Sequence, residues 1–219
     1  MNLWTIVGRF KERLRMILDG LKYSDITIAE KFRREGAKIG KNCFIQIRKL
    51  ASEPYLVEIG DCVSITSGVN FATHDGASVI FREEFPYLRH FGKIIVEDNC
   101  FIGNGAIIMS GVRIGRNSII GANSVVISDV KEGSIMMGNP AVRISTTEKY
   151  KQRCIEEWTR QGLAKFGPKF AGKNKIEIQR IMMSPEFREV LKNTLLAADL
   201  PPRAKEDKRG ENSKSAQAG

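Results

Sequence analysis

The sequence contains only two histidines, His74 and His90, and four cysteines among 219 residues. No CxxC pair and no close histidine–cysteine pair occurs, so the spacing typical of a metal site is missing, and we expect no bound metal. Cysteines without paired spacing favour a reducing compartment over a disulfide-bonded secreted fold.

Long apolar runs are absent as well. No stretch of about 18 apolar residues occurs, so we expect no transmembrane span. The N-terminus also lacks a continuous apolar segment followed by a small-residue cleavage site, the pattern of a secretory signal. Together with the cysteine pattern, these absences predict a cytoplasmic protein.

Acidic residues are outnumbered, and the formal net charge is +10. The basic residues are spread along the whole chain, without interleaved aromatics or a nucleic-acid-binding motif, so we expect no nucleic-acid partner. A basic surface suits a polyanionic ligand, an acidic glycan or a membrane face, and it is equally typical of a plain solvated surface. The charge alone therefore leaves the partner open.

A period of six residues dominates the middle of the chain. Neither the period of a helix nor that of a strand produces it, whereas a parallel β-helix does, with one short strand and one turn per repeat. An aliphatic residue returns at every sixth position, and a small or modest side chain follows it four positions later. Cys100 is one of these small residues, and Cys43 has the same place after Ile39. We expect both sets to point into the core and the interspersed glycines to permit unusual backbone angles. The repeated aliphatics are Val96, Ile102, Ile108, Ile114, Ile120 and Val126.

The same spacing sets the domain boundaries. We predict an all-β core, a parallel β-helix over residues 37–146. The repeat fails twice, at a small loop over 48–56 and at an insertion over 75–92. Because insertions in repeat arrays map to loops that often form the binding face, residues 75–92 are the candidate acceptor-binding arm.

The segments before and after the repeat do not have the six-residue period. Residues 1–36 are predicted to form a helical cap, with an amphipathic helix over 1–22 that either packs on the open coil or contacts a membrane surface peripherally. Residues 147–200 are predicted to be a helical extension. Residues 201–219 have little apolar content and are expected to be disordered.

His74 is the candidate catalytic residue. It stands where the repeat breaks off into the insertion, and a neutral imidazole can accept a proton from an attacking hydroxyl or amine. The alternative is a loop histidine that is hydrogen-bonded to the backbone. Its orienting partner is open from sequence, because Asp75 is adjacent and its side chain would diverge, and a backbone carbonyl serves equally well.

Three segments together resemble the hexapeptide-repeat acyltransferases: CFIGNGAIIMSGVRIGRNSIIGANSVV at 100–126, GNPAVRI at 138–144 and FATHDG at 71–76. The pattern is most similar to galactoside, maltose and xenobiotic acetyltransferases and to polysaccharide O-acetyltransferases. The resemblance implies a left-handed β-helix, a homotrimer with acetyl-CoA between subunits, and His74 as general base for direct transfer without an acyl-enzyme. Acceptors differ within the family, and the C-terminal helices and the basic surface favour a hydroxyl of a sugar or surface glycan, as in polysaccharide biosynthesis.

The resemblance also assigns binding residues. Those for the donor are Gly103, Asn104, Gly121, Ala122, Asn139 and Arg143. The candidates for acceptor binding come instead from their place beside His74 or on the insertion, and they are Asn70, Asp75, Arg82 and Tyr87. The chain departs from the family at Ser128, where several sugar acetyltransferases have a lysine, and Lys131 or Arg116 are candidates to supply that charge.

Several alternatives stay open at this point. A xenobiotic acetyltransferase or an N-acetyltransferase acting on an amino sugar would share the base and the donor site. A non-catalytic β-helix scaffold is a further interpretation. A zinc-dependent γ-carbonic anhydrase needs three histidines around the metal, and this chain has two.

Overall fold

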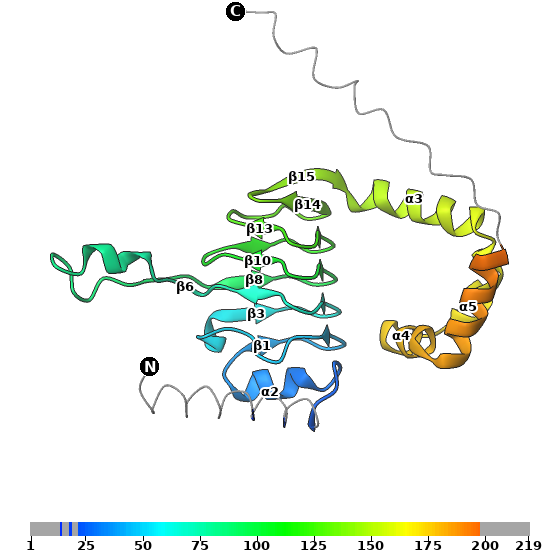
Figure 1. Cartoon of the computed structure of the whole chain (residues 1–219), viewed down its shortest axis with the longest axis horizontal. Coiled ribbons are helices and arrows are strands. Elements are labelled where there is room, and N and C mark those ends of the chain that lie inside the picture. The colour runs from blue at the N-terminus through cyan, green and yellow to red at the C-terminus, as the bar shows by residue number, and fades with distance from the viewer. Residues whose placement is uncertain (1–13, 15–17, 19–21, 198–219) are drawn as a thin grey trace, which may run out of the picture.

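The computed structural model describes residues 14, 18 and 22–197. Apart from positions 14, 18 and 22, the predicted helix over 1–22 therefore lies outside the described residues, as does the tail 201–219. The described chain is a three-sided prism of short parallel strands, with a projecting arm on one side and a group of helices on the other (Figure 1).

Three sheets form the sides of the prism. Sheet A contains β1 (Lys38–Ile39), β3 (Val57–Ile59), β8 (Ile94–Val96) and β11 (Arg113–Ile114). Sheet B contains β2 (Phe44–Ile45), β4 (Ser64–Ile65), β9 (Phe101–Ile102), β12 (Ile119–Ile120), β14 (Ser134–Gly138) and β15 (Ala141–Thr146). Sheet C contains β5 (Asn70–Phe71), β10 (Ile107–Ile108) and β13 (Val125–Val126).

From β3 to β13, apart from the two strands of the arm, consecutive strands fall on sheets A, B and C in turn, and those from β3 to β10 each pair in parallel with the strand three repeats later. Val96 is thus in register with Ile114, Ile102 with Ile120, and Ile108 with Val126. All six repeated aliphatics are at most 1% exposed, and the small residues that follow them are buried too, Cys43 and Cys100 included. The six-residue period therefore gives each coil one inward side chain per sheet and one per corner.

The glycines after the aliphatics serve a different purpose from the predicted one. Gly103, Gly115 and Gly121 do not have a positive φ. A Cβ on Gly103 would instead lie 2.6 Å from the backbone nitrogen of Ala122, so glycine is needed because adjacent coils approach closely. In several repeats a left-handed position comes two residues later, and it is filled by glycine at Gly105 and by asparagine in four other places. Those asparagines are Asn42, Asn99, Asn117 and Asn123.

Both ends of the prism are covered. Within the predicted cap over 1–36, helix α2 (Ile28–Arg34) buries Ile28 and Phe32 against the first coil. At the other end, β14 turns back into β15 as an antiparallel pair, so the coil pattern stops before residue 146. The polar edges of the terminal coils are thereby kept from pairing with further strands.

The predicted insertion is an ordered hairpin, hereafter the arm, residues 74–91. It begins one residue earlier than expected, at β6 (His74–Asp75), continues through the 3₁₀ helix η2 (Ala77–Phe81) and returns along the antiparallel β7 (His90–Phe91). The arm projects from the prism between β5 and β8 (Figure 1). The smaller loop over 48–56 contains the 3₁₀ helix η1 (Pro54–Leu56).

The segment predicted as a helical extension forms α3 (Thr147–Arg160), the 3₁₀ helix η3 (Leu163–Phe170), α4 (Lys175–Met183) and α5 (Pro185–Ala197). These helices share a small core of their own, in which Phe166 and Phe187 meet edge to face with ring centroids 5.7 Å apart. No helix among the described residues is long and apolar enough to cross a membrane.

Candidate active site

His74 lies where the chain leaves sheet C and enters the arm. Its Nδ1 lies 2.9 Å from Oε2 of Glu53, which comes from the loop over 48–56. The hydroxyl of Thr73 donates to the same oxygen at 2.5 Å. Thr73 is only 1% exposed, whereas the His74 ring is partly open to solvent. A buried threonine, a carboxylate and an accessible imidazole therefore form one continuous array.

The array sets the protonation of its members. The hydrogen bond from Thr73, followed by that from His74, holds the pKa of the Glu53 carboxyl below its usual value of 4.5, so Glu53 is ionised at neutral pH. An ionised carboxylate only accepts hydrogen bonds, so Nδ1 of His74 must carry the hydrogen. The other ring nitrogen, Nε2, then has a free lone pair and can take a proton from a bound acceptor.

Glu53 is the site residue that the sequence analysis missed. The sequence left the orienting group of His74 open, and in the structure the carboxylate of Glu53 lies at Nδ1. Asp75 does not contribute, since its Oδ1 accepts a hydrogen bond from the backbone of Ala77 at 2.7 Å. The one available signal was the small excess of residues over 48–56, which lets this loop bulge toward the histidine.

A pocket of about 490 Å³ opens beside His74. It lies between the 48–56 loop and β5, and its polar lining includes Lys49, Ser52 and Asn70. The structure thus places Asn70, a candidate acceptor residue, and His74 in the lining of one pocket. Arg82 and Tyr87 do not line this pocket, and Tyr87 is 87% exposed on the arm.

The predicted donor residues lie at a different corner. Gly103, Asn104, Gly121 and Ala122 belong to the turns that join sheet B to sheet C. These turns are stacked on one another. The side-chain amide of Asn104 donates to the hydroxyl of Ser67 in the coil below, at 3.0 Å, and its backbone carbonyl accepts from the backbone N–H of Asn123 in the coil above. His74 follows sheet C, so a full strand separates it from this corner within one chain.

The remaining donor residues lie at the closing end. Asn139 is in the turn between β14 and β15, and Arg143 is exposed on β15 opposite Met136. β14 and β15 lie at the end of the prism remote from α2 (Figure 1), and the strands β8 to β13 separate them from the arm.

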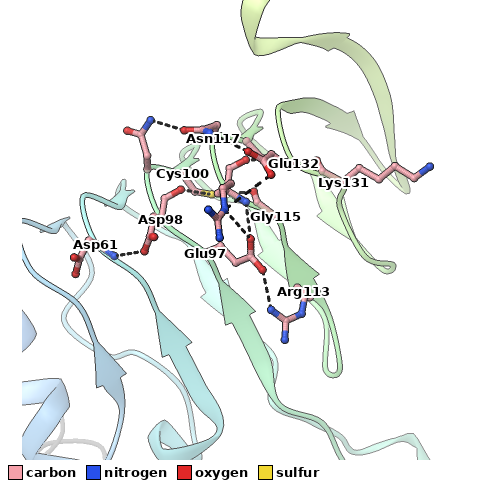
Figure 2. A network of polar contacts seen from close by, with 12 residues as sticks. Asp61, Glu97, Asp98, Cys100, Arg113, Gly115, Asn117, Lys131 and Glu132 are labelled. Carbon is pink, nitrogen blue, oxygen red and sulfur yellow. Dashed lines mark hydrogen bonds and ion pairs between the residues drawn. The ribbon is translucent and has the colours of Figure 1, made fainter.

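Both candidate replacements for the family lysine lie at a different corner of the prism from Ser128. Ser128 lies in the turn from sheet C to sheet A, whereas Arg116 and Lys131 lie where sheet A turns into sheet B. Arg116 is held near Glu97 and Glu132, at 3.8 and 3.9 Å, within a ladder of polar contacts. Figure 2 shows that ladder, with the Lys131 side chain extending away from it.

His90 and the cysteines stay outside the site. The arm pairs His74 with Phe91 and Asp75 with His90, so the two histidines point to opposite faces of the hairpin. Burial raises the pKa of the Cys43 thiol, which keeps it protonated in the core. Within residues 22–197, no group of three or more histidine, cysteine or acidic side chains is arranged to hold a metal ion.

Comparison with known proteins identifies the repeat. Residues 93–128 match the family model described as bacterial transferase hexapeptide (six repeats). Protein CapG of Staphylococcus aureus is 45% identical over 130 residues, which cover 58% of this chain and 76% of CapG. The galactoside O-acetyltransferase of Lactococcus lactis is 30% identical over 52% of this chain and 64% of its own length.

Among solved structures, the hexapeptide-repeat-containing acetyltransferase of Vibrio cholerae, complexed with acetyl coenzyme A, matches at 31% identity with a TM-score of 0.47. The match covers 51% of this chain and 60% of that one. The 45% identity to CapG extends over 76% of that protein. Together with the matched repeat, it shows to which family the chain belongs. It is an acyltransferase of the hexapeptide-repeat transferase family.

Proposed function

We propose that this protein is an acetyl-CoA-dependent O-acetyltransferase that acetylates a hydroxyl of a sugar or surface glycan. The observation that carries the proposal is the Thr73–Glu53–His74 array beside an open pocket. A carboxylate that fixes the tautomer of an accessible imidazole is the arrangement that general-base catalysis requires. The surrounding prism would be a left-handed parallel β-helix.

In this reaction Nε2 of His74 removes the proton of the acceptor hydroxyl as its oxygen attacks the thioester carbonyl. The new C–O ester bond forms, the C–S bond breaks, and the thiolate of coenzyme A leaves and takes the proton back from the imidazolium. Glu53 stabilises the imidazolium that exists between the two proton transfers, through its contact with Nδ1. No covalent acyl-enzyme is needed, because donor and acceptor are bound together.

The positions of the residues support a homotrimer. His74 and the turns at Gly103 and Gly121 lie at different corners of one prism, so they would line one acetyl-CoA groove only if two subunits packed side by side. Exposed apolar side chains on the prism, such as Phe101 and Ile127, offer surface for such packing. Asn139 and Arg143 would then lie near the nucleotide end of the donor.

For the acceptor, we favour a glycan over a drug, with a cytoplasmic biosynthetic role. The galactoside O-acetyltransferase of Lactococcus lactis supports a sugar hydroxyl, and Ser52 and Asn70 in the pocket suit hydroxyl groups. The chloramphenicol acetyltransferase of Klebsiella aerogenes, 29% identical over 60% of its length, makes an antibiotic the second class to test. An amino sugar, acetylated on nitrogen, is the third.

Acetyl transfer, followed as release of free thiol, tests this function. The purified chain would be incubated with acetyl-CoA and a panel of sugars, nucleotide sugars, amino sugars and chloramphenicol. We expect thiol release with sugar hydroxyl acceptors and an O-acetyl ester in the product by mass spectrometry. Transfer to chloramphenicol alone, or to amines alone, would replace the proposed acceptor class. Failure of the purified chain to bind acetyl-CoA would contradict the proposal that it is an acetyl-CoA-dependent enzyme.

Glu53→Gln tests the array separately. Glutamine keeps the shape but loses the charge that stabilises the imidazolium, so we expect kcat/KM to fall by about 10- to 100-fold. The acid limb of the kcat/KM profile should also move to lower pH. In the wild type, the stabilising contact that the ionised Glu53 carboxylate makes with His74 is fully present above the ordinary pKa of 4.5. It is lost as pH falls through the lowered pKa that Glu53 has in the folded state. Glu132→Gln is the matched control on an exposed glutamate outside the pocket, and an unchanged pH profile for Glu53→Gln would contradict the role.

A further inference from the structure

Thr73 is the buried member of the array beside His74, and its place is fixed by the backbone at the base of the arm. Its carbonyl accepts a hydrogen bond from the N–H of Gly92 at 2.9 Å, and its N–H donates to the carbonyl of Phe71 at 3.2 Å. The residue is 1% exposed, so water has little access to its hydroxyl. The hydroxyl therefore depends on Glu53 as its hydrogen-bond partner.

Two donors share one oxygen of the carboxylate. The hydroxyl of Thr73 and Nδ1 of His74 lie 2.5 and 2.9 Å from the same atom, Oε2 of Glu53. The bond from Thr73 is the largest of the effects that lower the pKa of the Glu53 carboxyl, ahead of the bond from His74. A hydrogen bond that stabilises a carboxylate also makes it a weaker acceptor for a second donor. Thr73 and His74 therefore compete for the charge on Oε2.

Other titratable side chains near His74 are not bonded to its ring. Asp75 and His90 face the opposite side of the hairpin, and the Asp75 carboxylate accepts from the backbone of the arm. Lys49, on the same loop as Glu53, lines the pocket. On β7 the side chain facing the imidazole is the uncharged Phe91, with ring centroids 5.9 Å apart. Glu53 is thus the charged group through which a neighbour can act on the ring.

We propose that Thr73 is a positioning residue of the transfer reaction, whose hydroxyl shares the Glu53 carboxylate with His74 and so limits how strongly the carboxylate stabilises the imidazolium. This inference rests on the proposed function and assigns Thr73 a role in it. The base must take a proton from the acceptor and then return it to the leaving thiolate, and too strong a pairing with Glu53 would hinder the return.

The hydroxyl also fixes the direction of the carboxylate. The last torsion of a glutamate side chain is broad, so a carboxylate with a single donor could turn and offer either oxygen to the ring. With the hydroxyl of Thr73 bound, Oε2 stays at Nδ1. The neutral ring then keeps the tautomer in which Nε2 can accept a proton.

NMR of the two imidazoles tests the inference without any substrate. The chain has two histidines, and His74→Ala identifies which signal belongs to which ring. Thr73→Val removes the hydroxyl and nearly keeps the shape, so the carboxylate pairs with the ring alone. We expect the titration midpoint of His74 to rise by about 0.3 to 1 pH unit, the value of one hydrogen bond. Glu53→Gln should move it in the opposite direction, and Thr73→Ser, which keeps the hydroxyl, should leave it at the wild-type value.

The pH profile of kcat/KM gives the second readout. Thr73→Val should move the acid limb to higher pH and lower the plateau by about 2- to 10-fold, because the ring is less firmly oriented. Thr73→Ser should restore both. Thr194→Val is the matched control, since this half-buried threonine on α5 donates its hydroxyl to the carbonyl of Val190 at 2.9 Å and contacts no carboxylate. It should keep the wild-type profile.

The outcomes separate this inference from the proposed function. A folded Thr73→Val protein whose His74 midpoint stays unchanged or falls would overturn the inference, and so would an equal rise in Thr73→Ser. Thr73→Ala removes the same donor and should raise the midpoint too, which covers the case in which the valine variant does not fold. A raised midpoint without a matching move of the acid limb would contradict the role in the reaction. Absence of acetyl transfer would contradict the proposed function and leave the NMR result valid.

Discussion

His74→Ala should lower kcat by about 10²- to 10⁴-fold, the range that general-base catalysis typically contributes. The ring supplies the only proton acceptor in the array that is open to the pocket, since Glu53 is bound to Thr73 and Thr73 is buried. Alanine removes this group and leaves the corner of the prism otherwise intact. The measurement is thiol release at saturating acetyl-CoA with the best acceptor of the panel.

His90→Ala provides the matched control, because it removes the other histidine of the chain from the opposite face of the same arm. It should retain activity within about threefold of the wild type. The circular dichroism spectrum and the oligomeric state should be the same for both variants and the wild type. Full turnover by a folded His74→Ala protein would assign the base to another residue, and equal losses in both variants would point to damage to the arm.

The prism could be predicted because its pattern is local and repeated. Ile102, Ile108 and Ile114 each fill one side of a coil, and a chain that places an aliphatic every six residues has few other ways to bury them. The glycines show the limit of this reasoning. Gly103 is small because the next coil lies against it, and that contact is visible only once the strands are paired across three repeats.

The candidate site was only half predictable. His74 is conspicuous because histidine is scarce and because it stands at a break in the repeat. Its partner Glu53 lies one coil earlier, in a loop of irregular length. The six-residue spacing does not apply within that loop, so it could not predict which residue lies beside His74. Sequence patterns locate residues that the repeat itself positions. They miss contacts that depend on how two irregular loops, at 48–56 and at the base of the arm, fold onto each other.

Ile114→Ala should reduce the free energy of unfolding by about 2–5 kcal/mol, as large-to-small substitutions in tightly packed cores do. Ile114 is 0% exposed, and it lies on β11, the last strand of sheet A, in register with Val96 below and bridged to Val130 above. Alanine would leave a cavity that two neighbouring coils border, and their backbone hydrogen bonds prevent the walls from collapsing into it. Ile155→Ala, the same change at a position on α3 that is 50% exposed, should alter stability by about 0.5 kcal/mol or less. Urea unfolding at one fixed protein concentration measures both, and equal losses for the two variants would contradict the inward orientation of the repeat.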